Sequence, residues 1–361
     1  MTTELPSIVA EQTKRAKARF STIDDARVRT FIASQPDVRG EVDLIEVRYL
    51  AEGAGQSNGI AFVTALLDRG HGLQAEKFVL RYSPGVSLFK QKCFQDEFLT
   101  LRAAHRRGLP VPLVYWLDAE GEALGMPAYI MERIEGDAPS SAVFSQGPIA
   151  NATPAERRRM MLEAADFHGQ LRRAAIGPDS VPHLARRGTG QTAIERELRW
   201  WLTEAQLARP PEDPLRRLVE HEIGWLIEHQ PTMYAPVLVH GDPQISNIMY
   251  RDGKFAAMLD WELSYLGHTE TDVACLCLQR DTLQAMDKRV EGTPSDQEYL
   301  TRYEAASGSQ VQHWEFFQMF ILAKTLCVYA CLGDVVPSFD LVWNYHRELL
   351  DTAKKRAQAA A

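Results

Sequence analysis

The feature that most constrains the fold is residues 238–267, "LVHGDPQISNIMYRDGKFAAMLDWELSYLG". Short apolar runs in this stretch predict strands, whereas the sequence on either side of it has helical periodicity. The dipeptide Asp252-Gly253 separates two of the runs and predicts a tight hairpin turn. A buried hairpin can hold polar and charged side chains only where a partner compensates them. The residues that require such a partner are His240, Asp242, Asn247 and Asp260.

The spacing of these polar residues indicates phosphoryl transfer. Asn247 follows Asp242 by five residues, and Asp260 follows the apolar run "FAAML". Protein kinases space a catalytic aspartate, a metal-binding asparagine and a metal-binding aspartate in the same way. The reaction needs a carboxylate that orients the attacking hydroxyl group, and oxygen ligands that hold Mg²⁺. Each residue alone is common in turns, but the complete set predicts a phosphoryl-transfer site. In this site Asn247 and Asp260 are expected at the same end of the hairpin.

The first part of the chain predicts an antiparallel sheet. An amphipathic helix is expected over residues 5–34, and three strand-like runs follow it at 42–50, 59–68 and 76–84. Helical periodicity returns at 93–108, and two further strands are expected around a turn at Glu120-Gly121. This part therefore predicts five strands with one helix.

The rest of the chain is helical in pattern apart from the hairpin region. The fold class expected is therefore α+β, with a small antiparallel β-sheet lobe over residues 1–131 and a larger, mainly helical lobe over 132–361. The expected helices cover residues 154–174, 191–208, 213–230, 271–287, 297–306, 311–332 and a tail from about 338.

Composition narrows the class of partner. Lys and Arg number 40 and Asp and Glu number 48, so the net charge of −8 argues against nucleic acid or an anionic membrane as the partner. The start of the chain has no apolar core of a signal peptide, and the five cysteines fit reduced thiols, so we expect a cytoplasmic protein. Gln318 and Lys324 interrupt the longest apolar stretch, which predicts a core helix rather than a membrane span.

Two features of the first lobe fit a nucleotide site. The turn "EGAGQSNG", with Ser57 and Asn58, precedes a strand, and a glycine-rich turn lets backbone N–H groups approach phosphate oxygens. Arg81 on the third strand and Glu97 on the following helix occupy the positions of the phosphate-binding cation and its glutamate partner in kinases. The alternative is a solvated arginine and an ordinary surface glutamate.

Taken together, these motifs resemble the aminoglycoside phosphotransferase and choline kinase superfamily. The resemblance rests on "GAGQSN", "FVLRYSPG", "PAYIMERIEGD", "LVHGDPQISNIMY" and "MLDWELSYLG" followed by "TDVA", and runs from about residue 40 to the end of the chain. It is strongest to the branch related to the kinase domain fused to certain acyl-CoA dehydrogenases. It implies a bilobal protein-kinase-like fold that binds ATP between its lobes, with Mg²⁺ as cofactor.

The resemblance also implies roles for individual residues. Asp242 would be the catalytic base, with Asn247 and Asp260 as Mg²⁺ ligands. His240 and Asp272 would brace the catalytic loop, and Glu262 would assist the metal or the substrate. The nucleotide would meet Ser57, Asn58, Arg81 and Glu97 at its phosphates, Met131 behind the adenine, and backbone groups of Glu132 and Ile134 at the adenine edge.

Two positions depart from the family pattern. Arg81 stands where many antibiotic kinases have lysine, and arginine also binds phosphate, in a bidentate way. His268 stands where this branch usually has an acidic residue, which puts in doubt any metal or substrate role for that position.

The acceptor is the part of the function that the sequence leaves open. The helical segment 150–230 is rich in arginine, which favours a neutral or anionic hydroxyl substrate such as a hydroxyacyl-CoA or a hydroxylated catabolic intermediate. Trp200 and Trp201 could line its pocket or simply pack. The alternatives are an aminoglycoside or other antibiotic kinase, an AMP-transferring enzyme, and a nucleotide-binding regulator without catalysis. The choice of ATP or GTP and the oligomeric state stay open.

Overall fold

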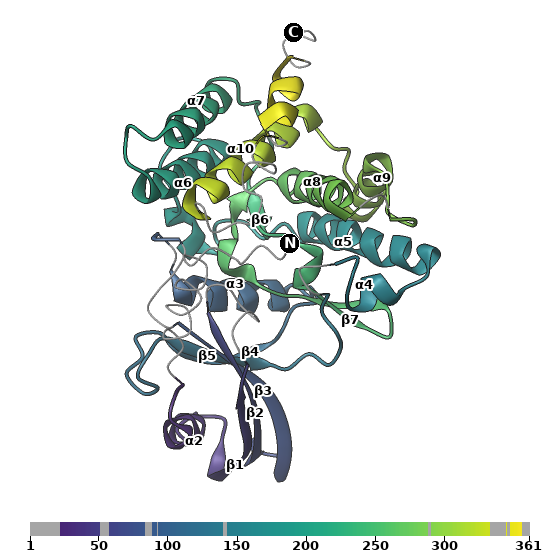
Figure 1. Cartoon of the computed structure of the whole chain (residues 1–361). Coiled ribbons are helices and arrows are strands. Elements are labelled where there is room, and N and C mark those ends of the chain that lie inside the picture. Colours follow the sequence, from purple (N-terminus) through teal and green to yellow (C-terminus); the bar gives the residue numbers. More distant parts are fainter. Residues whose placement is uncertain are drawn as a thin grey trace, which may run out of the picture. The chain divides into compact units, whose positions relative to one another are not determined.

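A computed structural model describes residues 22–50, 58–83, 89–91, 93–139, 143–287, 290–332, 344 and 347–355 (Figure 1). The chain divides into two compact units: unit 1 comprises residues 1–98 and 112–133, and unit 2 comprises 99–111 and 134–361. The sequence-based lobe limits, 1–131 and 132–361, stay a prediction of where the functional domains divide. Helix α3 (Phe94–Arg106) begins in unit 1 and continues in unit 2.

Unit 1 is built on one five-stranded antiparallel sheet, which confirms the predicted strands. The strand order is β1-β2-β3-β5-β4. Side chains of β2 alternate between buried and half-buried, so one face of the sheet forms the core, with Val63 and Phe78 fully buried there. The strands are β1 (Arg39–Tyr49), β2 (Gly59–Asp68), β3 (Leu73–Tyr82), β4 (Val114–Asp118) and β5 (Ala128–Glu132).

The N-terminal helix is shorter than the sequence predicts. Helix α2 (Asp25–Ala33) packs against β1, and it begins after Asp24, whose side chain accepts a hydrogen bond from Ala26 N–H at 2.8 Å. Because Asp24 has extended backbone angles and caps the helix, one continuous helix over 5–34 is ruled out. Residues 1–21 of that expected helix lie outside the described part of the chain.

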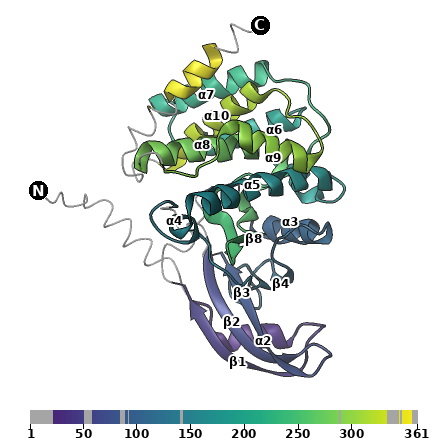
Figure 2. The ribbon, with the colours of Figure 1, turned by 90° about the vertical axis from the view of Figure 1, so that its right-hand side faces the viewer.

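Unit 2 is mainly helical, as expected. Helix α5 begins with a reciprocal capping box between Thr153 and Glu156, and α5 packs against α9, which Figure 2 shows beside it. A tail helix was expected from about residue 338, and the described residues 347–355 are helical. Residues 333–343 lie outside the described part. The helices are α4 (Pro148–Asn151), α5 (Pro154–Ala174), α6 (Ala193–Ala208), α7 (Pro214–Glu228), α8 (Glu270–Asp287), α9 (Asp296–Ser307) and α10 (Trp314–Leu332).

Two small antiparallel sheets interrupt the helices of unit 2 at the predicted place. Strand β6 (Val237–Val239) pairs with β9 (Tyr265–Gly267), and β7 (Ile248–Arg251) pairs with β8 (Lys254–Met258). Asp252 and Gly253 form the β7–β8 turn with φ of 51° and 69°, the left-handed pair that a two-residue hairpin turn of this kind needs. The short 3-10 helices are η1 (Pro182–Arg186), η2 (Ile245–Asn247) and η3 (Trp261–Leu263).

Helix α10 is the central helix of unit 2. It contacts α6, α7 and α8, and most of its side chains are buried (Figure 1). Among the described helices, it alone is long and apolar enough to cross a membrane by length and composition, and the greater part of its apolar window is covered by the protein itself. This burial is that of a core helix. Lys324 is a buried cation in its middle.

Candidate active site

The loop after β6 is fixed by a neutral histidine. His240 is fully buried, its Nδ1 accepts the Asp242 backbone N–H at 3.2 Å, and its Nε2 lies 2.9 Å from the Leu259 carbonyl oxygen. These contacts require a proton on Nε2 and none on Nδ1. Burial lowers the pKa of His240 to about 4, against the opposing charge of Asp272, so this neutral form persists at neutral pH. The imidazole thereby joins the loop to the end of β8.

Gly241 holds a backbone conformation that other residues avoid. Its φ is +85°, and a Cβ added to it would lie 2.2 Å from the carbonyl oxygen of Leu263. Both restrictions favour glycine. The backbone immediately before Asp242 is thus fixed in a conformation that requires glycine.

Asp272 supports the same loop from the first turn of α8. Its carboxylate accepts the backbone N–H groups of His240 at 2.9 Å and Gly241 at 3.0 Å, and His168 Nδ1 lies 3.1 Å from it. Burial alone would raise the pKa of Asp272, but His168, His240 and these hydrogen bonds hold the pKa below its ordinary value. Asp272 therefore stays ionised inside the protein.

The carboxylate of Asp242 is half-buried and held at both oxygens. Gln244 Nε2 donates to Oδ1 at 2.9 Å, and Asn247 Nδ2 donates to Oδ2 at 3.1 Å. Burial, followed by the charge of Asp260, raises the pKa of Asp242 to about 6, while the two amides and Lys324 oppose that rise. An oriented carboxylate with a pKa near neutrality has the properties of a general base.

The β7–β8 hairpin brings Asn247 and Asp260 to the same end, as the sequence predicts. The Leu259 N–H donates to the Asn247 carbonyl oxygen at 2.8 Å, so Asp260 follows directly beyond this pair. Asp260 has φ of +62°, an uncommon conformation for aspartate that clusters at functional sites. Because the Asn247 amide nitrogen is occupied by Asp242, its amide oxygen is the acceptor left to face a cation.

The oxygen donors at this end fit Mg²⁺. Over the described residues, no three His, Cys, Asp or Glu side chains cluster so that they could hold a metal by themselves. An amide oxygen and one carboxylate are the partial oxygen set with which Mg²⁺ is usually held, because the ion keeps water and phosphate oxygens as its other ligands. Asn247 and Asp260 would hold the ion, and it would supply positive charge to phosphate oxygens there.

Lys324 and His168 are the site residues that sequence reasoning missed. The Lys324 ammonium group donates to the carbonyl oxygen of Gly241 and lies 5.0 Å from the centre of the Trp201 ring. Lys324 could have been noticed in the sequence as a single lysine inside an apolar run, since an unpaired buried lysine is rare. His168 lies on the buried face of α5, and the sequence could have indicated it as a polar residue on an apolar helix face.

Unit 1 brings together two of the residues expected to serve the nucleotide. Arg81 Nε lies 3.0 Å from Glu97 Oε2, and the two side chains are 9% and 2% exposed. Both side chains are therefore buried, so the alternative of a solvated arginine and a surface glutamate is wrong. Asn58 is also buried. Ser57 lies outside the described residues.

The other expected residues have simpler surroundings. Met131 and Glu132 are half-buried at the end of β5, and the Glu132 backbone N–H donates to the Leu113 carbonyl oxygen at 2.7 Å. Ile134 is half-buried just after this strand, and Glu262 is half-buried in η3. His268 is buried with its ring 4.7 Å from that of Tyr234 and 6.1 Å from that of Phe317.

The arginines of segment 150–230 largely serve the protein itself. Arg157 donates to backbone carbonyl oxygens at the ends of neighbouring segments, among them Ile149 at 3.1 Å. Arg159 pairs with Glu163 at 3.1 Å, and Arg187 makes a two-pronged pair with Glu197 at 2.8 and 3.1 Å. The arginine content of this segment is therefore no measure of the charge of an acceptor.

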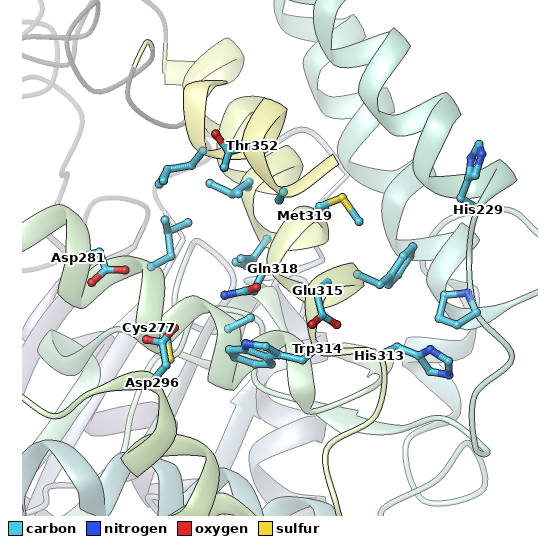
Figure 3. A pocket seen from close by; sticks show the side chains of 18 of the residues that line it. His229, Cys277, Asp281, Asp296, His313, Trp314, Glu315, Gln318, Met319 and Thr352 are labelled. Carbon is cyan, nitrogen blue, oxygen red and sulfur yellow. The ribbon is translucent and has the colours of Figure 1, made fainter. Parts of the chain in front are cut away.

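A separate cavity of about 1090 Å³ lies in unit 2 between α7, α8, α10 and the tail. Figure 3 shows Trp314, Gln318 and Met319 of α10 around it, with Cys277 and Asp281 of α8 to one side. Asp242, Asn247 and Asp260 do not line it. Gln318 and Leu322 line it one helical turn apart, whereas Lys324 lies on another side of α10. This cavity is thus distinct from the loop that carries Asp242.

The sequence model of the phosphotransferase enzyme family matches residues 56–320. The chain belongs to this family. The matched range contains the loop at Asp242, the hairpin and the Arg81–Glu97 pair, and this membership confirms the resemblance seen in the sequence.

Known proteins similar to this phosphotransferase agree with the fold. A probable acyl-CoA dehydrogenase of Arabidopsis thaliana, IBR3, is 29% identical over 299 residues, which cover 77% of this chain and 35% of that protein. The crystal structure of a putative aminoglycoside phosphotransferase from Ralstonia eutropha JMP134 has a TM-score of 0.69 at 20% identity, covering 94% of this chain and 99% of that one. Amicoumacin kinase hAmiN, solved with AMP-PNP, Ca²⁺ and Ami, has a TM-score of 0.57 at 13% identity, covering 94% and 96%.

These likenesses confirm the α+β kinase-like fold of the phosphotransferase. The chain spans only about a third of the length of the acyl-CoA dehydrogenase relative that it matches.

Proposed function

We propose that this phosphotransferase is a cytoplasmic small-molecule kinase that transfers the γ-phosphate of ATP to a hydroxyl group of a metabolite, with Asp242 as the catalytic base. The observation that carries the proposal is the Asp242 carboxylate, which amide donors hold at both oxygens and whose pKa is raised to about 6. A pure binding module has no need of such a base.

Asp242 acts on the acceptor. Its carboxylate receives the hydroxyl hydrogen of the acceptor, aligns the oxygen for attack and takes the proton as the bond to phosphorus forms. Gln244 and Asn247 keep the carboxylate in one orientation during this step. The buried bracing by His240 and Asp272 prevents the loop from relaxing away from the acceptor.

The remaining roles serve the nucleotide. Asn247 and Asp260 hold Mg²⁺, which supplies positive charge to the phosphates when bound. Arg81, oriented by Glu97, binds phosphate oxygens, with Ser57 and Asn58 at the phosphate-covering turn. Met131, Glu132 and Ile134 receive the adenine, and Glu262 assists the metal or the acceptor. The nucleotide and divalent cation named with amicoumacin kinase support this assignment.

The acceptor class that we propose is a hydroxyacyl-CoA or another hydroxylated catabolic intermediate. Support comes from the acyl-CoA dehydrogenase relative, whose name points to acyl-group metabolism. The second candidate is an aminoglycoside, which the name of the Ralstonia eutropha structure favours. The two differ in charge, so the acceptor panel below separates them.

The test is an ADP-release assay with Mg·ATP against hydroxyacyl-CoAs, hydroxylated aromatics, amino alcohols and aminoglycosides. Wild type is compared with Asp242→Ala and with Asp179→Ala, a control at an exposed aspartate. We expect acceptor-dependent ADP release that Asp242→Ala loses and Asp179→Ala keeps. Pyrophosphate release instead of ADP would show AMP transfer. Nucleotide binding without turnover on any acceptor, unchanged in Asp242→Ala, would show a regulator.

A further inference from the structure

Lys324 carries a buried positive charge that the protein only partly satisfies. The residue is about 6% exposed, and an ammonium group has three N–H donors. Within the part of the chain that the structure describes, the carbonyl oxygen of Gly241 is the acceptor that it reaches. No carboxylate among these residues forms an ion pair with it. A buried ammonium ion is costly unless an anion or further acceptors meet it.

The aromatic neighbours of Lys324 reduce this cost without removing it. Its Nζ lies 5.0 Å from the centre of the Trp201 ring and 5.9 Å from that of Tyr265. Aromatic faces attract a cation at this range, but they accept no conventional hydrogen bond from it. Within the described residues, two N–H donors of Lys324 therefore have no conventional acceptor.

Lys324 lies at the start of the loop that carries Asp242. It contacts Gly241, the residue immediately before Asp242, and its aromatic neighbours belong to α6 and β9. Among the described residues, these contacts of Lys324 do not include the β7–β8 hairpin, at whose end the proposed metal ligands lie. Arg187, the other cation near Tyr265, already has Glu197 as its bidentate partner. Among the described residues, Lys324 is thus a buried cation beside the proposed base with no carboxylate at ion-pair distance, although its charge also acts on the Asp242 carboxylate.

We propose that Lys324 binds an acidic group of the acceptor, so that the natural acceptor carries a carboxylate in addition to the hydroxyl group that Asp242 addresses. This inference rests on the proposed kinase function and names its acceptor class: an anionic alcohol. The acid of the acceptor supplies the oxygen acceptors that the ammonium group lacks, and Lys324 offsets the repulsion between that acid and the Asp242 carboxylate.

The test uses acceptors that differ only in charge. The probes are 3-hydroxybutyrate, 4-hydroxybutyrate and 3-hydroxyoctanoate, each beside its primary amide. ADP release gives kcat/KM, and calorimetric titration gives binding independently of turnover. For wild type we expect each acid to be preferred over its amide by about tenfold or more, the effect of one charge-assisted hydrogen bond.

The variants separate the charge of Lys324 from its support of the loop. Lys324→Met should bring the ratio of acid to amide close to one, and Lys324→Arg should keep a preference for the acid. Lys254→Met makes the same change at an exposed residue of β8 and should keep the wild-type ratio. Thermal unfolding of each variant checks that it folds, and the wild-type comparison decides the question even if Lys324→Met does not fold.

The outcomes have distinct meanings. Equal binding of acids and amides by wild type, or an equal loss for both in Lys324→Met, would overturn the proposal, because Lys324 would then act only through Gly241 or on the transferring phosphoryl group. Failure of every acid to bind would also overturn it. Lys324-dependent binding of the acids without ADP release would support the anion site while rejecting the kinase function.

Discussion

The Asp272 carboxylate accepts the backbone N–H of His240 at 2.9 Å, although a hairpin, two 3-10 helices and a strand lie between the two residues in the sequence. The same carboxylate accepts the Gly241 N–H at 3.0 Å. One buried anion at the start of α8 therefore fixes the two residues that precede Asp242. The loop that carries Asp242 is therefore held by the buried carboxylate of Asp272 as well as by its own sequence.

Removal of the Asp272 carboxylate should destabilise the protein and abolish activity. Asp272→Ala leaves two buried N–H groups without their acceptor, and we expect the unfolding free energy to fall by about 3–5 kcal/mol. Urea unfolding followed by circular dichroism measures this change, with Asp179→Ala as the exposed control. Wild-type stability in Asp272→Ala would contradict the bracing role.

Substitution of Gly241 should cost more than its backbone angle alone explains. Gly108 has a similar φ, +74°, with no heavy atom within 4 Å of an added Cβ, whereas at Gly241 the Cβ would meet the Leu263 carbonyl oxygen. Gly108→Ala should lower the unfolding free energy by about 1–2 kcal/mol, and Gly241→Ala by clearly more, with loss of phosphotransfer. Equal effects in urea unfolding would show that the contact with Leu263 is unimportant.

Stability should fall on acidification partly because of His268. Burial, aided by the charge of Arg172, lowers the pKa of His268 to about 4, against about 6.5 in an unfolded chain. Between these values the unfolded chain binds more protons, so the unfolding free energy decreases as the pH falls from 6.5 to 4, by about 3 kcal/mol at the full shift.

His268→Phe keeps a ring against Tyr234 and Phe317 and removes this titration. Because His240 contributes in the same direction, the wild type and the variant are compared in urea at several pH values. We expect a shallower dependence on pH in the variant. Parallel curves would mean that His268 titrates normally in the folded protein.

The Arg81–Glu97 pair should matter for both folding and nucleotide binding. Arg81→Met leaves the Glu97 carboxylate buried without its cation, so we expect a loss of about 3–5 kcal/mol in unfolding free energy and at least about tenfold weaker binding of Mg·ATP. Arg48→Met breaks an exposed pair with Glu46 in the same sheet and should change neither. Nucleotide titration at a temperature where both variants are folded separates the two effects. Unchanged affinity would remove Arg81 from the nucleotide site.

The hairpin and its polar residues could be predicted because local sequence determines them. The apolar runs, the Asp252-Gly253 turn and the spacing from Asp242 to Asn247 all lie within residues 238–267, and strand pairing across a two-residue turn leaves little choice of register. The five strands of unit 1 were predictable for the same reason, since alternating runs and turns follow one another along the chain.

Lys324 could not be assigned because its partner is distant in sequence. The apolar run around it predicts a buried helix, but only tertiary packing decides that its ammonium group meets the carbonyl oxygen of Gly241. For segment 150–230, the arginine content suggested a neutral or anionic acceptor. Arginines of this segment such as Arg157 and Arg187 instead bind the protein's own carbonyl and carboxylate groups. The start of α2 was missed because Asp24 interrupts a helical pattern with a side-chain cap.

The position of Lys324 has a consequence for how relatives are grouped. The family model matches residues 56–320. A comparison restricted to that range includes the proposed base and the proposed metal ligands but omits Lys324, which contacts the residue before Asp242. Two chains with identical catalytic motifs can therefore differ at this helical position. If Lys324 binds an acidic group of the acceptor, sorting family members by the side chain aligned with Lys324 would divide them by the charge of the molecule they modify.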